Sequence, residues 1–174
     1  ADSLPPGKLA VCAASCGPGN THLIQGLYDA HRNGAKVLAL ASHIPSRQIG
    51  SKFFQETHPE AIFQECSGYC EMVNSAEQGG VVLHHAIQST MAGNGVSVLV
   101  IPGDVSMQEA EDDAFVESKI SAGRPVVYPD PAEAAALTQA INEAKSVTLF
   151  VGAGVKDARE QVLKLAEKIK APIG

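Results

Sequence analysis

Two glycine-containing turns in this sequence have the composition and position of ligand-binding turns. The first, Ser15-Cys16-Gly17-Pro18-Gly19, lies between an apolar run and a segment with helical spacing of its apolar residues. The second, Gly152-Ala153-Gly154, lies between another apolar run and an amphipathic segment. Glycine lets a ligand approach the backbone, and the amino end of a helix favours electron-rich groups such as phosphate. An ordinary strand-to-helix turn has the same composition, so both interpretations remain open.

The cysteines and histidines do not have the spacing of a metal site. The cysteines form two C-x3-C pairs, Cys12 with Cys16 and Cys66 with Cys70, whereas zinc sites usually contain C-x2-C. We expect buried structural thiols in a reducing compartment. His84 and His85 are adjacent on a predicted helix and point in different directions, so we predict no metal site.

The first glycine turn belongs to a predicted strand–helix–strand unit. Residues 9–14 have the length and apolar character of a strand, and residues 36–41 form a second apolar run, typical of a parallel strand covered on both faces. Between them lies a helix with Asn20 or Thr21 as its predicted N-cap and Gly34 as its stop. The rest of the chain is therefore expected to extend an α/β sheet.

Further elements follow this unit. Residues 42–57 contain breaks at His43-Ile44-Pro45 and Gly50, residues 71–94 are predicted to be helical, and residues 96–101 form a third apolar strand. The near-repeat of Phe-Gln-Glu at 54–56 and 63–65 is either coincidence or a local helix.

A second domain is predicted to begin near Pro131. The acidic run at 108–113 and the closely spaced prolines indicate a linker over residues 113–130. We then expect a helix begun by Pro131 and capped by Asp130, a strand at 146–151 and a helix at 157–170. Three elements do not easily bury a core, so we expect this α/β domain to be incomplete in the present chain.

Composition excludes several functional classes. Hydrophobic residues make up 45% and charged residues 18% of the 174 residues, which is typical of a globular protein. The formal net charge of −6, without a cluster of Lys and Arg, argues against a nucleic-acid partner. The sequence contains no apolar run of transmembrane length and no recognisable signal peptide. The reducing compartment expected from the cysteines makes the cytoplasm the expected location.

Taken together, several segments resemble one enzyme family. The chain is similar to the pyrimidine-binding domain of thiamine-diphosphate enzymes, and within them to the flavin-containing pyruvate dehydrogenase (quinone) or pyruvate oxidase group. The segments that carry the resemblance are CGPGNTHLIQGLYDAHRNGAKVLALASHIPS, FFQETHP, ECSGYCEMV and GVSVLVIPGDV. The resemblance implies a parallel sheet flanked by helices over residues 1–112, incomplete, followed by the start of a Rossmann-like, FAD-binding middle domain at 131–174.

The resemblance also implies roles for individual residues. Pro18 and His22 match positions that line the thiamine pocket, and Phe54 and Gln55 match an element beside the reacting carbon of the cofactor. Their side chains suit pyruvate, because an aromatic ring excludes water and an amide binds an oxygen atom. Alternatively, His22 faces a subunit interface, Phe54 is a core residue and Gln55 is solvated.

Two further positions match the flavin-binding domain, whereas the family's catalytic glutamate and its Mg²⁺ motif have no counterpart in this sequence. Gly152 and Gly154 are expected to contact a phosphate of FAD, although Asp157 replaces the third glycine of the G-x-G-x-x-G pattern. The family's catalytic glutamate would precede Ala1. Pro102-Gly103-Asp104 lacks the features of the family's Mg²⁺ motif, so Asp104 receives no metal role.

The resemblance implies an enzyme that oxidatively decarboxylates pyruvate with thiamine diphosphate, Mg²⁺ and FAD, and that passes electrons to a quinone. It also implies a homo-oligomer, a dimer-based tetramer, with peripheral attachment to the inner face of the cell membrane as a further possibility. The alternatives are an acetolactate synthase-type carboligase and a catalytically silent fragment or interaction module. The isolated chain is expected to be inactive.

Overall fold

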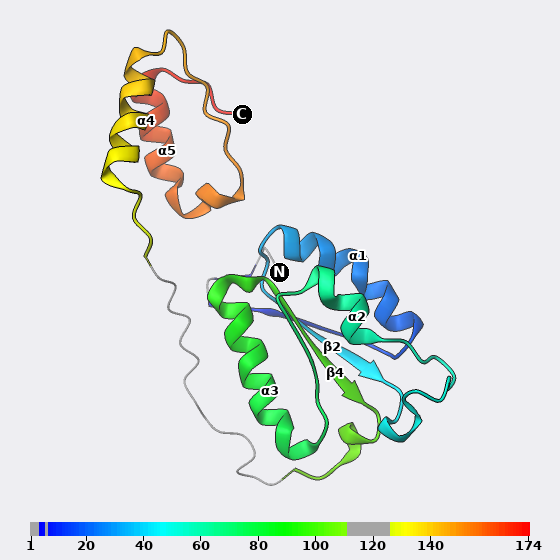
Figure 1. Cartoon of the computed structure of the whole chain (residues 1–174). Helices are drawn as coiled ribbons and strands as arrows, with labels where there is room; N and C mark the ends of the chain where they lie inside the picture. The colour runs from blue at the N-terminus through cyan, green and yellow to red at the C-terminus, as the bar shows by residue number, and fades with distance from the viewer. Residues whose placement is uncertain (1–3, 6, 111–125) are drawn as a thin grey trace. The chain divides into compact units, whose positions relative to one another are not determined.

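The computed structural model describes residues 4–5, 7–110 and 126–174, and the chain divides into two compact units, residues 1–124 and 125–174 (Figure 1). Each unit is described by itself. Most of the predicted linker, residues 113–125, lies outside the described residues, so the assignment of domains remains a prediction.

The first unit is built on a sheet of four parallel strands in the order β1-β2-β4-β3. This arrangement confirms the predicted parallel sheet flanked by helices. The elements are β1 (Ala10–Ala14), α1 (Pro18–Arg32), β2 (Val37–His43), the 3₁₀ turn η1 (Ser46–Gln48), α2 (Pro59–Phe63), the 3₁₀ turn η2 (Gln64–Cys66), β3 (Tyr69–Met72), α3 (Ala76–Ser89), the π-helical turn η3 (Thr90–Asn94), β4 (Val96–Pro102) and the 3₁₀ turn η4 (Val105–Met107).

Helices cover both faces of this sheet, as Figure 1 shows. On one face, Leu27 of α1 and Phe63 of α2 pack against alternate residues of β2 and β4, including Val98. On the other face, Val82 of α3 packs against Leu99 and its neighbours. Because successive strand residues point to opposite faces, the continuous apolar runs of β2 and β4 supply both cores at once.

The predicted helix at 71–94 is wrong at its amino end. Glu71 lies in β3, which pairs in parallel with β4 at the edge of the sheet, and α3 begins only after Ser75, whose hydroxyl accepts a hydrogen bond from the Gln78 amide. The strand is short and its residues are half-buried or exposed, so it lacks the apolar run that identified the other strands. The second copy of the near-repeat is a local helix, formed by α2 and η2.

The predicted N-cap of α1 is also wrong. The helix begins at Pro18, one turn earlier than Asn20 or Thr21 would place it, and Gly17 is the N-cap without a side-chain hydrogen bond. Proline favours the first helical position because its missing N–H has no intrahelical partner there. Asn20 is instead fully buried inside the first turn.

The second unit contains α4 (Pro131–Glu143), the 3₁₀ helix η5 (Ala153–Ala158) and α5 (Arg159–Ile169). Asp130 is the N-cap of α4, as predicted, and its carboxylate accepts hydrogen bonds from two backbone amides. The predicted strand at 146–151 is reduced to one parallel bridge between Leu149 and Ile173. The predicted helix at 157–170 begins two residues later, because η5 occupies residues up to Ala158.

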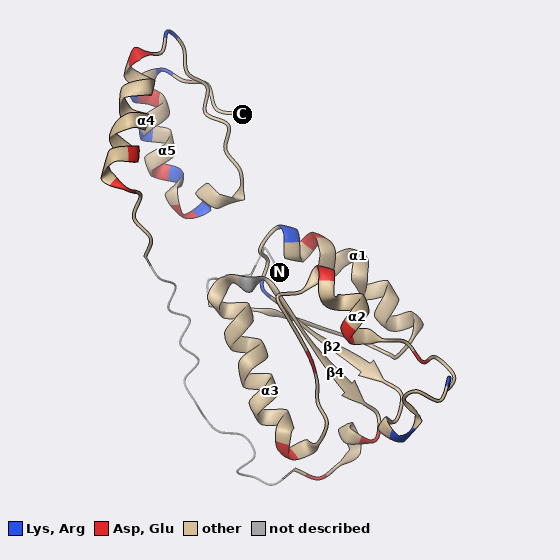
Figure 2. Ribbon diagram, viewed as in Figure 1, with Lys and Arg blue, Asp and Glu red and all other residues tan. Residues whose placement is uncertain are grey.

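Charge is unevenly distributed over the helices. Figure 2 shows basic residues and glutamates side by side along α5, whereas α3 carries charge only at Glu77. Within the described residues, no helix is long and apolar enough to cross a membrane.

Candidate functional site

The candidate site lies where the parallel strands of the first unit end, an edge that we call the carboxyl edge. The turn after β1, the loop after β2 and the turn after β4 all lie at this edge, because the strands are parallel and in register. Open α/β sheets bind ligands outside the carboxyl ends of their strands. The sequence-predicted residues Pro18, Phe54 and Gln55 all belong to these connections.

Gly17 and Gln55 lie in close contact at this edge. A Cβ atom on Gly17 would lie 2.8 Å from the Gln55 Cβ and 3.0 Å from its carbonyl oxygen. Gly17 also has a φ of 64°, a left-handed conformation that side chains other than glycine rarely adopt. Glycine is therefore required in this turn for two reasons, its backbone conformation and its contact with Gln55.

Gln55 is held against this turn through its side chain as well. The Cys16 thiol donates a hydrogen bond to Gln55 Oε1 over 3.4 Å. Because Oε1 accepts this bond, the N–H donors of the amide are the groups left for a ligand oxygen. Phe54 precedes Gln55 and is 80% exposed, so its ring lies on the surface of the first unit and not in its core.

The segment that carries both residues, here called the Phe54 loop (residues 50–56), is closed by Glu56. Its carboxylate accepts hydrogen bonds from the Gly50 amide over 2.5 Å and from the Phe53 amide over 3.0 Å. These bonds, with the Gly50 contribution the largest, lower the pKa of Glu56 below its ordinary value. The carboxylate is therefore ionised at neutral pH.

A second carboxylate ties the start of the loop after β2 to the end of β4. Asp104 accepts one hydrogen bond from the Ser46 hydroxyl and another from the Ser46 amide over 2.8 Å. The hydroxyl bond is the main cause of the lowered pKa of Asp104. Asp104 thus has a structural role at the carboxyl edge, and no metal role was expected of it.

Buried polar groups lie beneath these loops. Asn20 is fully buried and donates from Nδ2 to the Ser42 carbonyl over 2.8 Å. Its Oδ1 atom, Nδ1 of buried His43 and Oγ1 of Thr57 have no hydrogen-bond partner within the described part of the chain. Burial lowers the pKa of His43, so its ring is neutral at neutral pH. Buried polar atoms of this kind usually bind water or a ligand.

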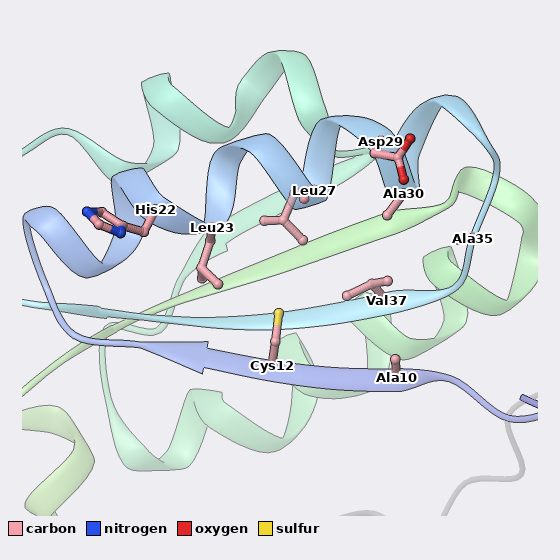
Figure 3. Close-up of a pocket in the computed structure, with 10 residues that line it drawn as sticks. Ala10, Cys12, His22, Leu23, Leu27, Asp29, Ala30, Ala35 and Val37 are labelled. Carbon is pink, nitrogen blue, oxygen red and sulfur yellow. The ribbon is translucent and has the colours of Figure 1, made fainter. Parts of the chain in front are cut away.

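His22 belongs to a different cavity. It lines a groove of about 380 Å³ between α1 and β1, which we call the α1–β1 groove. Figure 3 shows Cys12, Leu23 and Leu27 facing this groove, with His22 toward the amino end of α1. The structure therefore places Pro18 next to Gly17, which contacts Gln55, whereas His22 lines the α1–β1 groove. A thiamine contact by His22 remains a prediction.

In the second unit, Gly152 and Gly154 lie at the start of η5 and not at the amino end of α5. A Cβ atom on either glycine would meet no described atom within 4 Å, so neither glycine is required by a close contact here. The structure shows no phosphate cradle formed by these two residues, and their contact with FAD remains a prediction.

Metal ligands are not gathered in the described residues, where no group of three or more His, Cys, Asp or Glu side chains is placed to hold an ion. All four cysteines are free thiols. Only Cys66 is fully buried, and burial raises the pKa of half-buried Cys70 to about 12. The expected burial is confirmed for Cys66, whereas Cys12, Cys16 and Cys70 are only half-buried.

The residues at the carboxyl edge combine an exposed aromatic ring with a polar amide beside the amino end of a helix. The amino end of α1 has no side-chain cap, the Phe54 ring is exposed, and the Gln55 side chain supplies an amide. Such a combination of apolar surface and few polar groups is typical of cofactor sites. Among the described residues, no group of three or more His, Cys, Asp or Glu side chains is placed to bind Mg²⁺.

Sequence reasoning did not assign functional roles to Cys16, Glu56 or Asn20. Glu56 had one available signal, because a carboxylate three residues after Phe53 is placed to bind the Phe53 amide, as in an Asx- or cap-like turn. The contacts of Cys16 and Asn20 with residues 39 and 22 positions away had no local signal.

Comparison with known proteins shows what this chain is similar to. Residues 4–62 match the family described as thiamine pyrophosphate enzyme, N-terminal TPP binding domain. The chain is 50% identical, over 96% of its length, to an uncharacterised 42.6 kDa protein of Pseudomonas amyloderamosa. It is 31% identical over 99% of its length to a pyruvate oxidase of Lactiplantibacillus plantarum, and 32% identical over 96% to an acetolactate synthase large subunit of Corynebacterium glutamicum.

The chain spans only part of these relatives, namely 42%, 29% and 27% of their respective lengths. The matched segment contains β1, α1, β2 and the Phe54 loop, which are the elements that build the carboxyl edge. Residues 4–62 are therefore similar in sequence to the N-terminal TPP-binding domain of thiamine pyrophosphate enzymes.

Proposed function

We propose that this chain is part of a thiamine-diphosphate flavoenzyme that oxidatively decarboxylates pyruvate. The net reaction converts pyruvate, water and a quinone into acetate, CO₂ and the quinol. One observation carries the proposal: the Gly17 turn and the Phe54 loop together present an exposed aromatic ring and an amide at the carboxyl edge. The similarity to a protein named pyruvate oxidase, at 31% identity, supports it.

Each residue has a chemical role in this proposal. Thiamine diphosphate and FAD supply an electron sink and a two-electron carrier when bound. Phe54 covers the substrate and excludes water, and the Gln55 amide donates a hydrogen bond to a carboxylate or carbonyl oxygen of pyruvate. Pro18 and Gly17 allow a cofactor ring to approach the backbone of the turn. FAD contact by Gly152 and Gly154 is part of the same proposal.

A carboligase of the acetolactate synthase type is the second candidate. The chain is 32% identical to such a protein, which is as similar as the pyruvate oxidase. In that reaction a second keto acid is joined to the decarboxylated pyruvate, and no electrons reach a quinone. An interaction module without catalysis is the third candidate.

The deciding experiment is anaerobic flavin absorbance of the longer protein that we propose carries this chain, with Mg²⁺ and thiamine diphosphate present. Bleaching of the flavin on addition of pyruvate is the expected result. Unbleached flavin with accumulation of acetolactate would assign the carboligase reaction. If neither signal is observed, the interaction module is the remaining candidate. Turnover of pyruvate by the 174-residue chain alone would contradict the proposal that catalysis needs the longer protein.

We propose in addition that the longer protein is a cytoplasmic homo-oligomer, a dimer-based tetramer, with peripheral attachment to the membrane that holds its quinone. Light scattering coupled to size-exclusion chromatography tests the tetramer. Co-sedimentation with lipid vesicles tests the attachment, with vesicle-free protein as the control.

A further inference from the structure

Glu56 closes the Phe54 loop on itself. Its Oε1 atom accepts from the Gly50 amide over 2.5 Å, its Oε2 atom accepts from the Phe53 amide over 3.0 Å, and its own amide donates to the Phe53 carbonyl over 2.9 Å. One side chain thus joins the beginning and the middle of the loop to its end. A hydrogen bond to a carboxylate is stronger than one between neutral groups.

The backbone of the loop needs such support. Lys52 and Gln55 have φ values of 60° and 64°, in the left-handed region that residues other than glycine rarely adopt. Burial does not compensate for these conformations, because Phe53 is 43% and Phe54 80% exposed. Hydrogen bonds to Glu56 are therefore the main interactions within the loop that favour its observed shape.

The shape of the loop decides where Gln55 lies. With its left-handed backbone, Gln55 places Cβ and the carbonyl oxygen against Gly17, and Oε1 within reach of the Cys16 thiol. If the loop opened, both contacts would be lost together, since they depend on the same residue. Backbone strain at functional sites persists where surrounding interactions over-determine it.

We propose that Glu56 is the positioning residue of this site: its ionised carboxylate holds the Phe54 loop so that Gln55 stays on the Gly17 turn and Phe54 faces the ligand. The effect on pyruvate rests on the proposed function, whereas the effect on the loop does not. The charged or titratable groups that act on Glu56 or share its surroundings are His58 and His43, and Glu60 acts on His43 as well.

The loop is tested on the whole 174-residue chain without any ligand. In Glu56→Gln we expect amide exchange at Gly50 and Phe53 to become at least tenfold faster, and alkylation of Cys16 to become several-fold faster. The matched control is Glu65→Gln, which removes the same charge from an exposed position. Unchanged NMR shifts of the β4 amides in both variants show that the sheet is intact. Unchanged exchange and alkylation in Glu56→Gln would overturn the proposal.

The positioning role is tested in the longer protein. We expect Glu56→Gln to lower kcat/KM for pyruvate by at least tenfold, mostly through KM, whereas Glu65→Gln leaves it unchanged. A loosened loop with unchanged pyruvate kinetics would overturn the positioning role. A wild-type protein that does not react with pyruvate would contradict the proposed function instead, and the exchange result at Gly50 and Phe53 would still decide whether Glu56 holds the loop.

Discussion

At the scale of single residues, the site depends on Gly17, a position of the turn where a side chain would not fit. Gly17 adopts a left-handed conformation and lies against Gln55, while Gly34, at the end of α1, has the same φ of 64° and nothing within 4 Å of its missing Cβ. The two glycines therefore separate two effects that usually occur together, the backbone conformation and the close contact.

Substitution of these glycines by alanine should differ in its cost. We expect Gly34→Ala to lower the free energy of unfolding by about 1 kcal/mol, from the positive φ alone. Gly17→Ala should lower it by roughly 2 kcal/mol more, because its Cβ would lie 2.8 Å from the Gln55 Cβ. Urea denaturation of both variants measures the difference. Equal effects would show that the Phe54 loop moves away at no cost.

The Asp104–Ser46 pair should make stability depend on pH. Because the folded pKa of Asp104 is lowered from 3.8, its contribution to stability is fully present above that pH and is lost as the pH falls through the folded pKa. Asp104→Asn should therefore destabilise the chain at pH 7, and the difference from wild type should shrink as the pH falls below 3.8 and through the folded pKa.

Denaturant midpoints at several pH values measure this effect. Ser46→Ala is the companion variant, because it removes the hydroxyl bond to Asp104 and keeps the amide bond. It should therefore remove only part of the pH dependence of stability that Asp104→Asn removes. A constant difference between wild type and Asp104→Asn from pH 7 to pH 2 would contradict the assignment.

At the scale of elements, the start of a helix was predictable where its cap is local. Asp130 and Pro131 form a cap and a first helical residue that are adjacent in the sequence, and the structure confirms both. At α1, the buried Asn20 has the residue type of a cap but donates to the Ser42 carbonyl instead. The difference arises because α1 packs against the sheet, whereas no described residue of α4 is buried.

The cap of α4 can be tested directly. Asp130→Ala should cost about 1 kcal/mol of helix stability, because two amides lose their acceptor, while Asp130→Ser should retain most of it. Hydrogen exchange of the α4 amides in both variants reports the change. Identical exchange in Asp130→Ala and wild type would show that the observed hydrogen bonds do not stabilise the helix.

At the scale of the whole molecule, the two units differ in how much core they contain. Among the described residues, the buried apolar side chains of the first unit fill both faces of the sheet, whereas the second unit buries only Ala166. Phe150 is 93% exposed beside the bridge between Leu149 and Ile173. Burial of apolar area is the main favourable contribution to folding, so the second unit is expected to be much less stable.

Native-state hydrogen exchange of the intact chain measures this difference. We expect the amides of α4 and α5 to exchange through a low-energy opening that leaves the β2 and β4 amides protected. The strand amides should exchange only with global unfolding of the first unit. A single common free energy for all slow amides would show that the two units unfold together.

Local features of the sequence determined the βαβ unit, the apolar runs of β2 and β4, and the cap of α4, because hydrophobic periodicity and turn chemistry act within a few residues. The half-buried edge strand β3 was missed, because it has little periodicity of its own and depends on pairing with β4. Pro18, Phe54 and Gln55 were named through a family resemblance, and not from any local pattern.

Only the tertiary structure decided how the candidate site is assembled. The contact between Cys16 and Gln55 joins residues 39 positions apart, and that between Ser46 and Asp104 joins residues 58 positions apart. Such pairs meet because the parallel register of β1, β2 and β4 brings the ends of these strands to one edge. Register depends on both faces of the sheet being buried at once, which is a property of the packed molecule and of no single segment.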